Sequence, residues 1–183
     1  MGATDLTFLV QDFNPGGASI TEGLVASLHK RHSNFRYLKL EEPMMGSKIR
    51  AMNEVTGGGV GVLEGWGGMY MLQLIGSGIC GVMPGLGLAD ILSRVFHMAR
   101  AREMDSAFDL FQGVLPHIVF SLQNMELYHH VEKHLLEARG VISSTAVRGL
   151  ALTVSADDRA FMDLNVRKIL SLLHRLKLPS GVV

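Results

Sequence analysis

The sequence has few of the features that define several large classes of protein. Its 183 residues include a single cysteine, Cys80, which excludes an internal disulfide framework and any metal site built from several cysteines. Lysine plus arginine and aspartate plus glutamate number 17 each, so no surplus of positive charge points to nucleic acid. We therefore expect no nucleic-acid partner and a reducing, cytoplasmic environment.

Long apolar runs and a targeting signal are also lacking. No uninterrupted apolar run reaches the roughly 18 residues that a membrane-spanning helix needs. The first ten residues, MGATDLTFLV, have no basic region ahead of their apolar stretch, as a secretory signal would. With 48% hydrophobic and 19% charged residues, the composition is typical of a globular protein with a sizeable core. We expect a soluble protein without a membrane partner.

The first half of the sequence alternates short apolar segments with helical patterns. Strands are predicted at 6–11, 35–40, 59–65 and 79–84, and helices at 19–32, 46–55 and 69–78. Ser19 and Ser47 are the candidate N-caps of the first two helices. Four strand–helix units in this order predict an α/β fold with a parallel sheet.

The second half is predicted to be helical. From Leu88 onward no segment has the pattern of a strand, and helices are predicted to begin near Asp90 and to cover about 104–123, 125–139 and 156–177. GLGLAD could hold a phosphate on backbone amides, but the glycines are expected to serve close helix–sheet packing. His130 and His134 have a possible metal spacing, but we expect a solvated helix face and no metal site.

The segment YLKLEEP, residues 37–43, places Lys39 near the end of a predicted strand. A free lysine has a pKa near 10.4 and is protonated at neutral pH, whereas only a neutral amine attacks a ketone. Burial in an apolar mouth would disfavour the ammonium and supply a nucleophile. The residues by themselves leave both interpretations open: a surface charge at a strand end, or an amine placed to react.

Several segments in collinear order resemble the dihydrodipicolinate synthase / N-acetylneuraminate lyase family of Schiff-base aldolases and dehydratases. They are YLKLEEP, GSKI, VLEGWGGMYMLQLIGSGICGVMPG, AREMDSAFDLFQGVLP and LLEARGVISSTAVRG, within a match that runs from about residue 6 to 177. The resemblance implies a partial (β/α)8 TIM barrel, about strands five to eight, in residues 1–85. It also implies that residues 86–183 form the last barrel helix and a C-terminal helical extension, so the chain looks like a barrel without its first four strands.

The resemblance implies that Lys39 is the catalytic residue, which forms an imine with a 2-keto acid such as pyruvate. Strand alternation places Glu41 on the same face as Lys39. Because a carboxylate in contact with Lys39 would favour the charged amine, we expect Glu41 to turn toward solvent or to orient substrate instead.

The resemblance also implies which residues surround the substrate. The candidate substrate-binding residues are Asp12, Phe13, Glu41, Gly65, Trp66, Met83 and Pro84. The family relays protons through a tyrosine at the end of the fifth strand, where this sequence has Gln11, Asp12 or Phe13. The family's Gly-Thr-Thr-Gly-Glu-like loop, which holds the substrate carboxylate, has no counterpart in the sequence.

The predicted function is therefore that of a lyase acting on a 2-keto acid, by aldol cleavage, condensation or dehydration, without a cofactor. Open strand edges and the resemblance both predict a homo-oligomer. The alternative is a non-catalytic, truncated remnant that acts as an oligomerising or binding module.

Overall fold

The computed structural model describes residues 1–13, 19–149 and 152–181. The chain forms two compact units, Met1–Met83 and Pro84–Val183. The first unit is α/β with a parallel sheet and the second is helical, so the predicted fold class is confirmed at that level. Within the described ranges, no helix is both long and apolar enough to cross a membrane.

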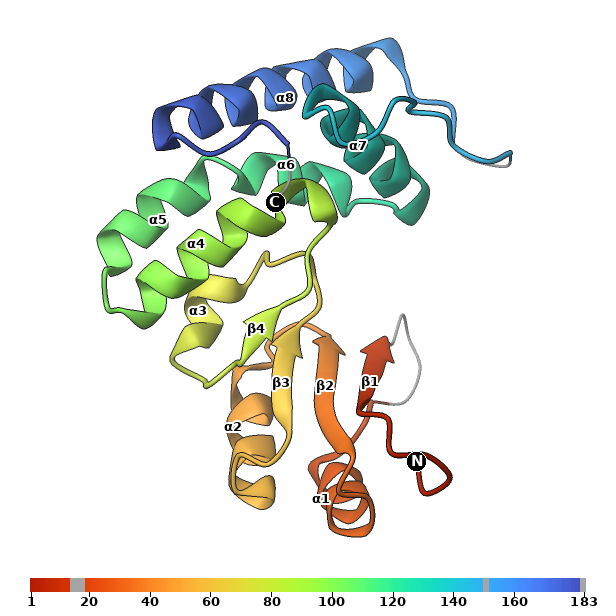
Figure 1. Ribbon diagram of the computed structural model, residues 1–183, viewed down its shortest axis with the longest axis vertical. Coiled ribbons are helices and arrows are strands. Elements are labelled where there is room, and N and C mark those ends of the chain that lie inside the picture. The colour runs from red at the N-terminus through yellow and green to blue at the C-terminus, as the bar shows by residue number, and fades with distance from the viewer. Residues whose placement is uncertain (14–18, 150–151, 182–183) are drawn as a thin grey trace. The chain divides into compact units, whose positions relative to one another are not determined.

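The first unit is built on four parallel strands in the order β1-β2-β3-β4 (Figure 1). The strands are β1 (Phe8–Phe13), β2 (Phe35–Glu41), β3 (Gly61–Glu64) and β4 (Gly81–Val82). The helices that follow the first three strands are α1 (Glu22–Arg31), α2 (Gly46–Thr56) and α3 (Met71–Ile75). Because each connection between parallel strands carries a helix, the predicted alternation of strands and helices is confirmed.

The two faces of this sheet differ in what covers them. Leu38, Leu40 and Val62 point to one face and are fully buried, together with Val25 of α1 and Ile49 of α2. The alternate residues point to the opposite face, which is called the open face below. It carries Leu9, Gln11, Phe13, Tyr37, Lys39, Glu41 and Leu63, none of which is fully buried. The core of the first unit thus lies on the helix-covered face.

Both predicted serine caps are wrong. Helix α1 is capped by Thr21, whose side chain accepts a hydrogen bond from the Leu24 amide, and helix α2 begins after Met45 without a side-chain cap. The Ser19 hydroxyl is engaged elsewhere, since it donates to the Glu42 carboxylate at 2.8 Å. The sequence pattern found the helices, but it could not show that Ser19 serves a tertiary contact instead of a cap.

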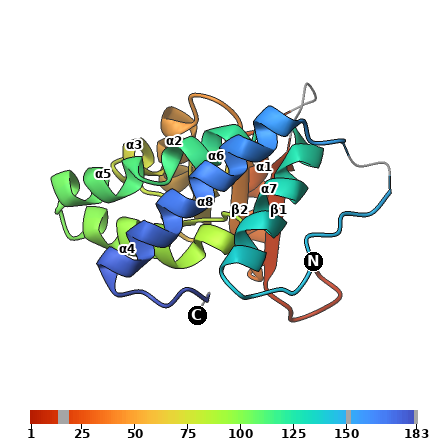
Figure 2. The same ribbon diagram turned by 90° about the horizontal axis from the view of Figure 1, so that it is seen from above.

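The second unit contains one short 3-10 helix and five α-helices in its described residues. They are η1 (Leu86–Leu88), α4 (Ala89–Arg100), α5 (Met104–Gln112), α6 (Leu115–Ser121), α7 (Met125–Ala138) and α8 (Ala156–Leu176). Helices α7 and α8 lie side by side in both views (Figures 1 and 2). Phe120, Leu127, Val131 and Met162 form a buried cluster between α6, α7 and α8.

The single helix predicted over 104–123 is two helices, α5 and α6. Pro116 lies in the first turn of α6 and has no amide hydrogen, so a continuous helix could not form its bond back to Gln112. At the break, Gly113 lies close to α8, because a Cβ there would lie 3.3 Å from a side-chain carbon of Leu172. The absence of a side chain at Gly113 therefore lets α8 approach closely.

The buried guanidinium of Arg139, at the end of α7, ties the second unit together. It pairs with both oxygens of Asp90, at 3.0 and 2.6 Å, and donates to the Gly87 carbonyl at 2.6 Å. It also donates to the carbonyls of Ser180, at 2.7 Å, and Gly181, at 3.0 Å. One side chain thus holds η1, α4 and the C-terminal segment to α7.

The GLGLAD glycines pack closely, but against helix α7 and not against the sheet, so the predicted helix–sheet packing is wrong. The Gly87 amide donates to the Glu132 carboxylate at 2.5 Å, which occupies a backbone donor that an anion would need. A Cβ at Gly85 would lie 2.6 Å from the Tyr128 hydroxyl. Burial raises the pKa of Glu132 above its ordinary value, although the Gly87 amide and Arg139 both act to lower it. Phosphate is therefore not proposed at this turn.

We predict that Arg139→Met lowers the free energy of unfolding by about 3–5 kcal/mol, because it leaves the Asp90 carboxylate and several carbonyl oxygens without their donor. Urea denaturation followed by circular dichroism measures the change. Arg167→Met on the exposed side of α8 is the matched control and should stay within about 0.5 kcal/mol of the parent. Equal losses in the two variants would contradict this role for Arg139.

Candidate active site

Lys39 lies near the carboxyl end of β2 on the open face of the sheet. In the parallel register it stands between Gln11 of β1 and Leu63 of β3. The Lys39 side chain is 16% exposed, so its amine is neither fully buried nor free in bulk solvent. A position at the carboxyl ends of parallel strands is where α/β folds bind their ligands.

The Lys39 amine contacts a carboxylate directly. Its Nζ lies 2.6 Å from Oε1 of Glu41, and the Glu41 side chain is 10% exposed. The Gln11 amide donates to the same Oε1 at 2.7 Å. The expectation that Glu41 would turn away from Lys39 is therefore wrong. Both side chains lie on one face of β2, and Gln11 from the neighbouring strand fixes the carboxylate beside the amine.

The absence of a side chain at Gly65 leaves room for the side chains of Lys39 and Glu41. A Cβ at Gly65 would lie 2.8 Å from Cε of Lys39 and 2.5 Å from Cγ of Glu41, both inside van der Waals contact. It would also lie 2.8 Å from the Leu40 carbonyl oxygen, which accepts the Gly65 amide. The backbone that follows β3 thus runs directly against the two charged side chains, and a residue with a side chain does not fit there.

Glu64, the last residue of β3, holds the loop after Gly65 from the other side of the sheet. Its carboxylate accepts hydrogen bonds from the amides of Gly68, at 2.7 Å, and Tyr70, at 3.4 Å. Gly67 and Gly68 adopt positive φ angles of 64° and 87°, which allow the chain to turn back over the carboxylate. Because Glu64 is fully buried, burial raises its pKa to about 7, and these amides only partly offset the effect.

Asp12 does not face Lys39. It pairs in register with Leu40, so its side chain points to the helix-covered face, where it is buried. Its Oδ2 accepts the Ile20 amide at 2.9 Å and pairs with Lys48 Nζ at 3.1 Å. Lys48 also pairs with Glu42 at 2.9 Å. The structure therefore places Asp12 in an ion cluster between the strand ends and α2, and not beside the predicted nucleophile.

The remaining predicted site residues lie in different surroundings. Phe13 is 54% exposed and stands beside Glu41 in the register of the open face. The Trp66 ring lies 5.9 Å from the Tyr70 ring, within the loop that Glu64 holds. Met83 is exposed, and its amide donates to the Glu64 carbonyl at 2.9 Å. Pro84 is the first residue of the second unit.

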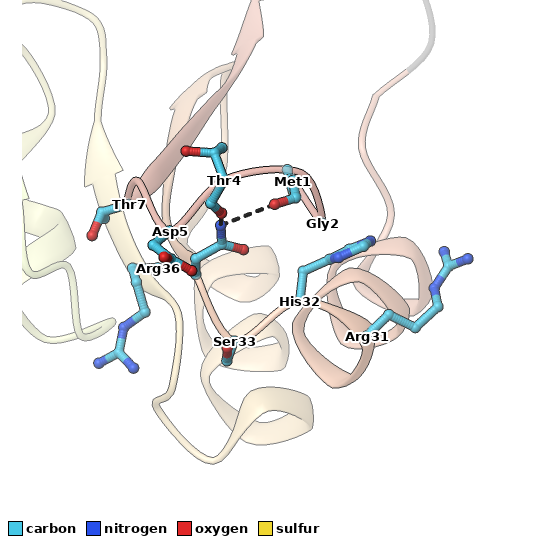
Figure 3. Close-up of a pocket in the computed structure, with 10 residues that line it drawn as sticks. Met1, Gly2, Thr4, Asp5, Thr7, Arg31, His32, Ser33 and Arg36 are labelled. Carbon is cyan, nitrogen blue, oxygen red and sulfur yellow. Dashed lines mark hydrogen bonds between the residues drawn. The ribbon is translucent and has the colours of Figure 1, made fainter.

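A hollow of about 520 Å³ lies elsewhere in the first unit (Figure 3). It is lined by the N-terminal loop and the segment before β2, at the amino ends of the strands. Asn34 ties the loop down by donating to the carbonyls of Met1, at 3.1 Å, and Thr4, at 2.8 Å. The side chains of Arg31 and Arg36 point away from one another (Figure 3), so no pair of charges converges on a ligand there.

No cluster of three or more metal-ligating side chains occurs in the described residues. The expectation that His130 and His134 lie on a solvated face is wrong, because both are half-buried. His134 pairs with Asp163 of α8 at 2.7 Å, and Nε2 of His130 is buried. His134 thus connects α7 to α8.

Two ionisable residues of the first unit were not singled out in the sequence. Glu64 directly precedes the GWGG turn, and an acid just before a glycine-rich turn is a signal for amide binding that could have been read. Lys48 sits in the first turn of α2, and no sequence spacing relates it to Asp12, which is far away in the chain.

Comparison with solved structures shows the fold of dihydrodipicolinate synthases and N-acetylneuraminate lyases. A dihydrodipicolinate synthase from Rhodopseudomonas palustris matches 90% of this chain with a TM-score of 0.81 and 24% sequence identity. An N-acetylneuraminate lyase from Fusobacterium nucleatum matches 88% with a TM-score of 0.73 and 13% identity. A prophage protein of the dihydrodipicolinic acid synthase family from E. coli K12, solved with pyruvate, matches 97% with a TM-score of 0.74 and 19% identity.

The match covers 56%, 54% and 58% of those three proteins, so the chain spans a little more than half the length of each. No family model and no curated protein sequence matches. The resemblance inferred from the sequence motifs is therefore confirmed as a likeness of fold over nearly the whole chain.

We predict that the buried Glu64 carboxyl makes stability fall as pH rises. Its pKa is raised to about 7, whereas the same group in the unfolded chain has a pKa near 4.5. The folded protein therefore holds a proton that the unfolded chain has released, and the free energy of unfolding falls as pH rises through this interval. Relative to Glu64→Gln, which cannot titrate, the parent should lose about 3 kcal/mol of unfolding free energy from about pH 5 to about pH 8. Urea melts at several pH values measure the difference, and a constant difference would contradict the assignment.

Proposed function

We propose that this chain is a lyase-type protein in which Lys39 forms a Schiff base with a 2-keto acid. The observation that carries the proposal is the place of Lys39: on the open face, at the carboxyl end of β2, with its side chain 16% exposed. The likeness of fold to lyases supports it, as does the pyruvate complex of one of these similar proteins. The family assignment of this chain is part of the proposal.

Cleavage of a carbon–carbon bond needs a group that accepts the electron pair of the broken bond, and an imine supplies such a group. A lysine amine adds to the ketone and loses water, which leaves a protonated imine. This cationic nitrogen withdraws electrons from the neighbouring carbon, so that a bond to the next carbon can break or form, or water can be lost. The reaction class is aldol cleavage, condensation or dehydration, and the imine supplies the electron sink without a cofactor.

Residues around Lys39 have roles that fit this chemistry. Gly65 leaves room beside the amine, and Phe13 and Glu41 stand next to it on the open face. Trp66 and Met83 follow at the ends of β3 and β4. We propose that these residues form one wall of the substrate pocket, and that the sheet is part of a (β/α)8 barrel whose other strands supply the site for the substrate carboxylate.

The second candidate function is a non-catalytic module that binds another protein or a second copy of this chain. Apolar side chains on and beside the open face favour it: Leu9, Phe13, Tyr37 and Met83 are all at least 40% exposed. In the part of the chain that the structure describes, β1 and β4 are the outer strands of the sheet, and such edges commonly pair with another chain. Association into a homo-oligomer is compatible with both functions, so the reactivity of Lys39 decides between them.

The deciding measurement is imine trapping. Incubation with millimolar pyruvate and borohydride should add the mass of one reduced pyruvate to the protein, and Lys39→Ala should abolish the addition. Lys48→Arg is the matched control, because Lys48 is also shielded from solvent but is held by two carboxylates. If the parent gains no mass, or if Lys39→Ala gains as much as the parent, the binding module is the better description.

Gly65→Ala tests the space beside the amine. The new methyl group would lie 2.8 Å from Cε of Lys39 and 2.5 Å from Cγ of Glu41, so both side chains must shift from their present positions. We expect trapping by pyruvate to slow by at least about tenfold, because a misplaced reactive group costs orders of magnitude in rate. Gly76→Ala is the matched control, because Gly76, like Gly65, lacks a positive φ, and a Cβ there would have no atom within 4 Å. Equal trapping rates in parent and Gly65→Ala would remove Gly65 from the proposed site.

A further inference from the structure

Imine formation requires two protons to leave the amine and reach the departing oxygen, and one carboxylate lies in contact with that amine. Resting on the proposed function, we propose that Glu41 is the proton relay of this site: it accepts a proton from Lys39 and returns it to the hydroxyl that leaves as water. The residues where the sequence resemblance implies a relay tyrosine are Gln11, Asp12 and Phe13, none of which is a tyrosine.

The geometry divides the two oxygens of Glu41 between two tasks. Oε1 lies 2.6 Å from Lys39 Nζ and accepts the Gln11 amide at 2.7 Å. Within residues 1–13, 19–149 and 152–181, no hydrogen bond to Oε2 is formed. The carboxylate therefore touches the amine through one oxygen and offers the other to a substrate, while Gln11 keeps its orientation fixed.

The proton balance closes without any other reactant. Glu41 accepts one proton from the Lys39 ammonium, and the neutral amine then attacks the keto carbon. As the carbon–nitrogen bond forms, the carbonyl π electrons move to oxygen. This oxygen takes the proton that Glu41 holds, and Glu41 then accepts the second proton from the nitrogen. Protonation of the hydroxyl by the Glu41 carboxyl then expels water. The nitrogen lone pair forms the C=N bond, and one positive charge remains on the iminium.

Other candidates for this role lie in the wrong place. The Asp12 carboxylate points to the helix-covered face, where it binds Lys48 and the Ile20 amide. Glu64 lies on the same covered face and accepts the Gly68 amide. Tyr37 shares the open face but stands two residues before Lys39, about 7 Å back along the strand. Of the carboxylates in the described part of the chain, Glu41 is the one paired with Lys39.

The test is the rate of pyruvate trapping by borohydride, sampled over time at several pH values. Glu41→Gln keeps the size of the side chain but cannot carry the proton, so trapping near neutral pH should slow by about 10²- to 10⁴-fold. The same final amount of adduct should still form. Glu42→Gln, the neighbouring carboxylate that binds Lys48 on the other side, should react at the parent rate.

Chemical rescue separates proton transfer from a structural effect. In Glu41→Ala, added formate should restore a large part of the trapping rate, in proportion to the formate ion present, because it fits the space that the side chain leaves. A parent that traps pyruvate no faster than Glu41→Gln, or a Glu41→Ala variant that formate does not accelerate, overturns the relay and leaves Lys39 as the nucleophile. A parent that forms no adduct overturns the proposed function and the relay with it.

Discussion

The contact on which the candidate site depends is the ion pair between Lys39 and Glu41, placed directly against the backbone of Gly65. Three separate constraints meet there. Strand alternation points both side chains to the same face, the parallel register brings Gln11 to the carboxylate, and the absence of a side chain at Gly65 leaves the amine its space. The three constraints come from β2, from β1 and from the residue that follows β3, so the geometry of the pair depends on the pairing of these three strands.

The first unit holds two shielded lysines at its strand ends, and their surroundings differ in a way that bears on reactivity. Lys48 is held by the carboxylates of Asp12 and Glu42 and also contacts the Ser19 hydroxyl, so its donors are used in joining α2 to the strand ends. Lys39 has one carboxylate partner and lies on the face that the helices leave open. Among the contacts of the described residues, Lys48 is therefore held by more oxygen acceptors than Lys39, which pairs with Glu41.

The sequence predicted the fold class and the face of the strand on which Lys39 lies, because both follow from local periodicity. It did not predict the direction in which Glu41 turns. The orientation of Glu41 depends on Gln11 as well as on Lys39, and Gln11 is brought close by a strand register that no local pattern encodes. The same limit explains the wrong cap at Ser19, whose hydroxyl binds Glu42, the residue that follows β2. At 104–123 a local signal was present, since Pro116 forbids the bond that a continuous helix needs.

The protonation of the Lys39–Glu41 pair depends on whether the open face is covered. An ion pair in contact with water contributes little to stability, because water already solvates both charges. The free-energy cost of keeping the two groups charged rises as water is removed. When a substrate or another chain covers Phe13 and Tyr37, water leaves the vicinity of the pair, and transfer of the proton from Lys39 to Glu41 removes both charges at once. In the proposed reaction, covering the face would therefore favour the neutral amine that attacks the ketone. On this argument the carboxylate that stabilises the resting ammonium in water becomes its proton acceptor in a closed site.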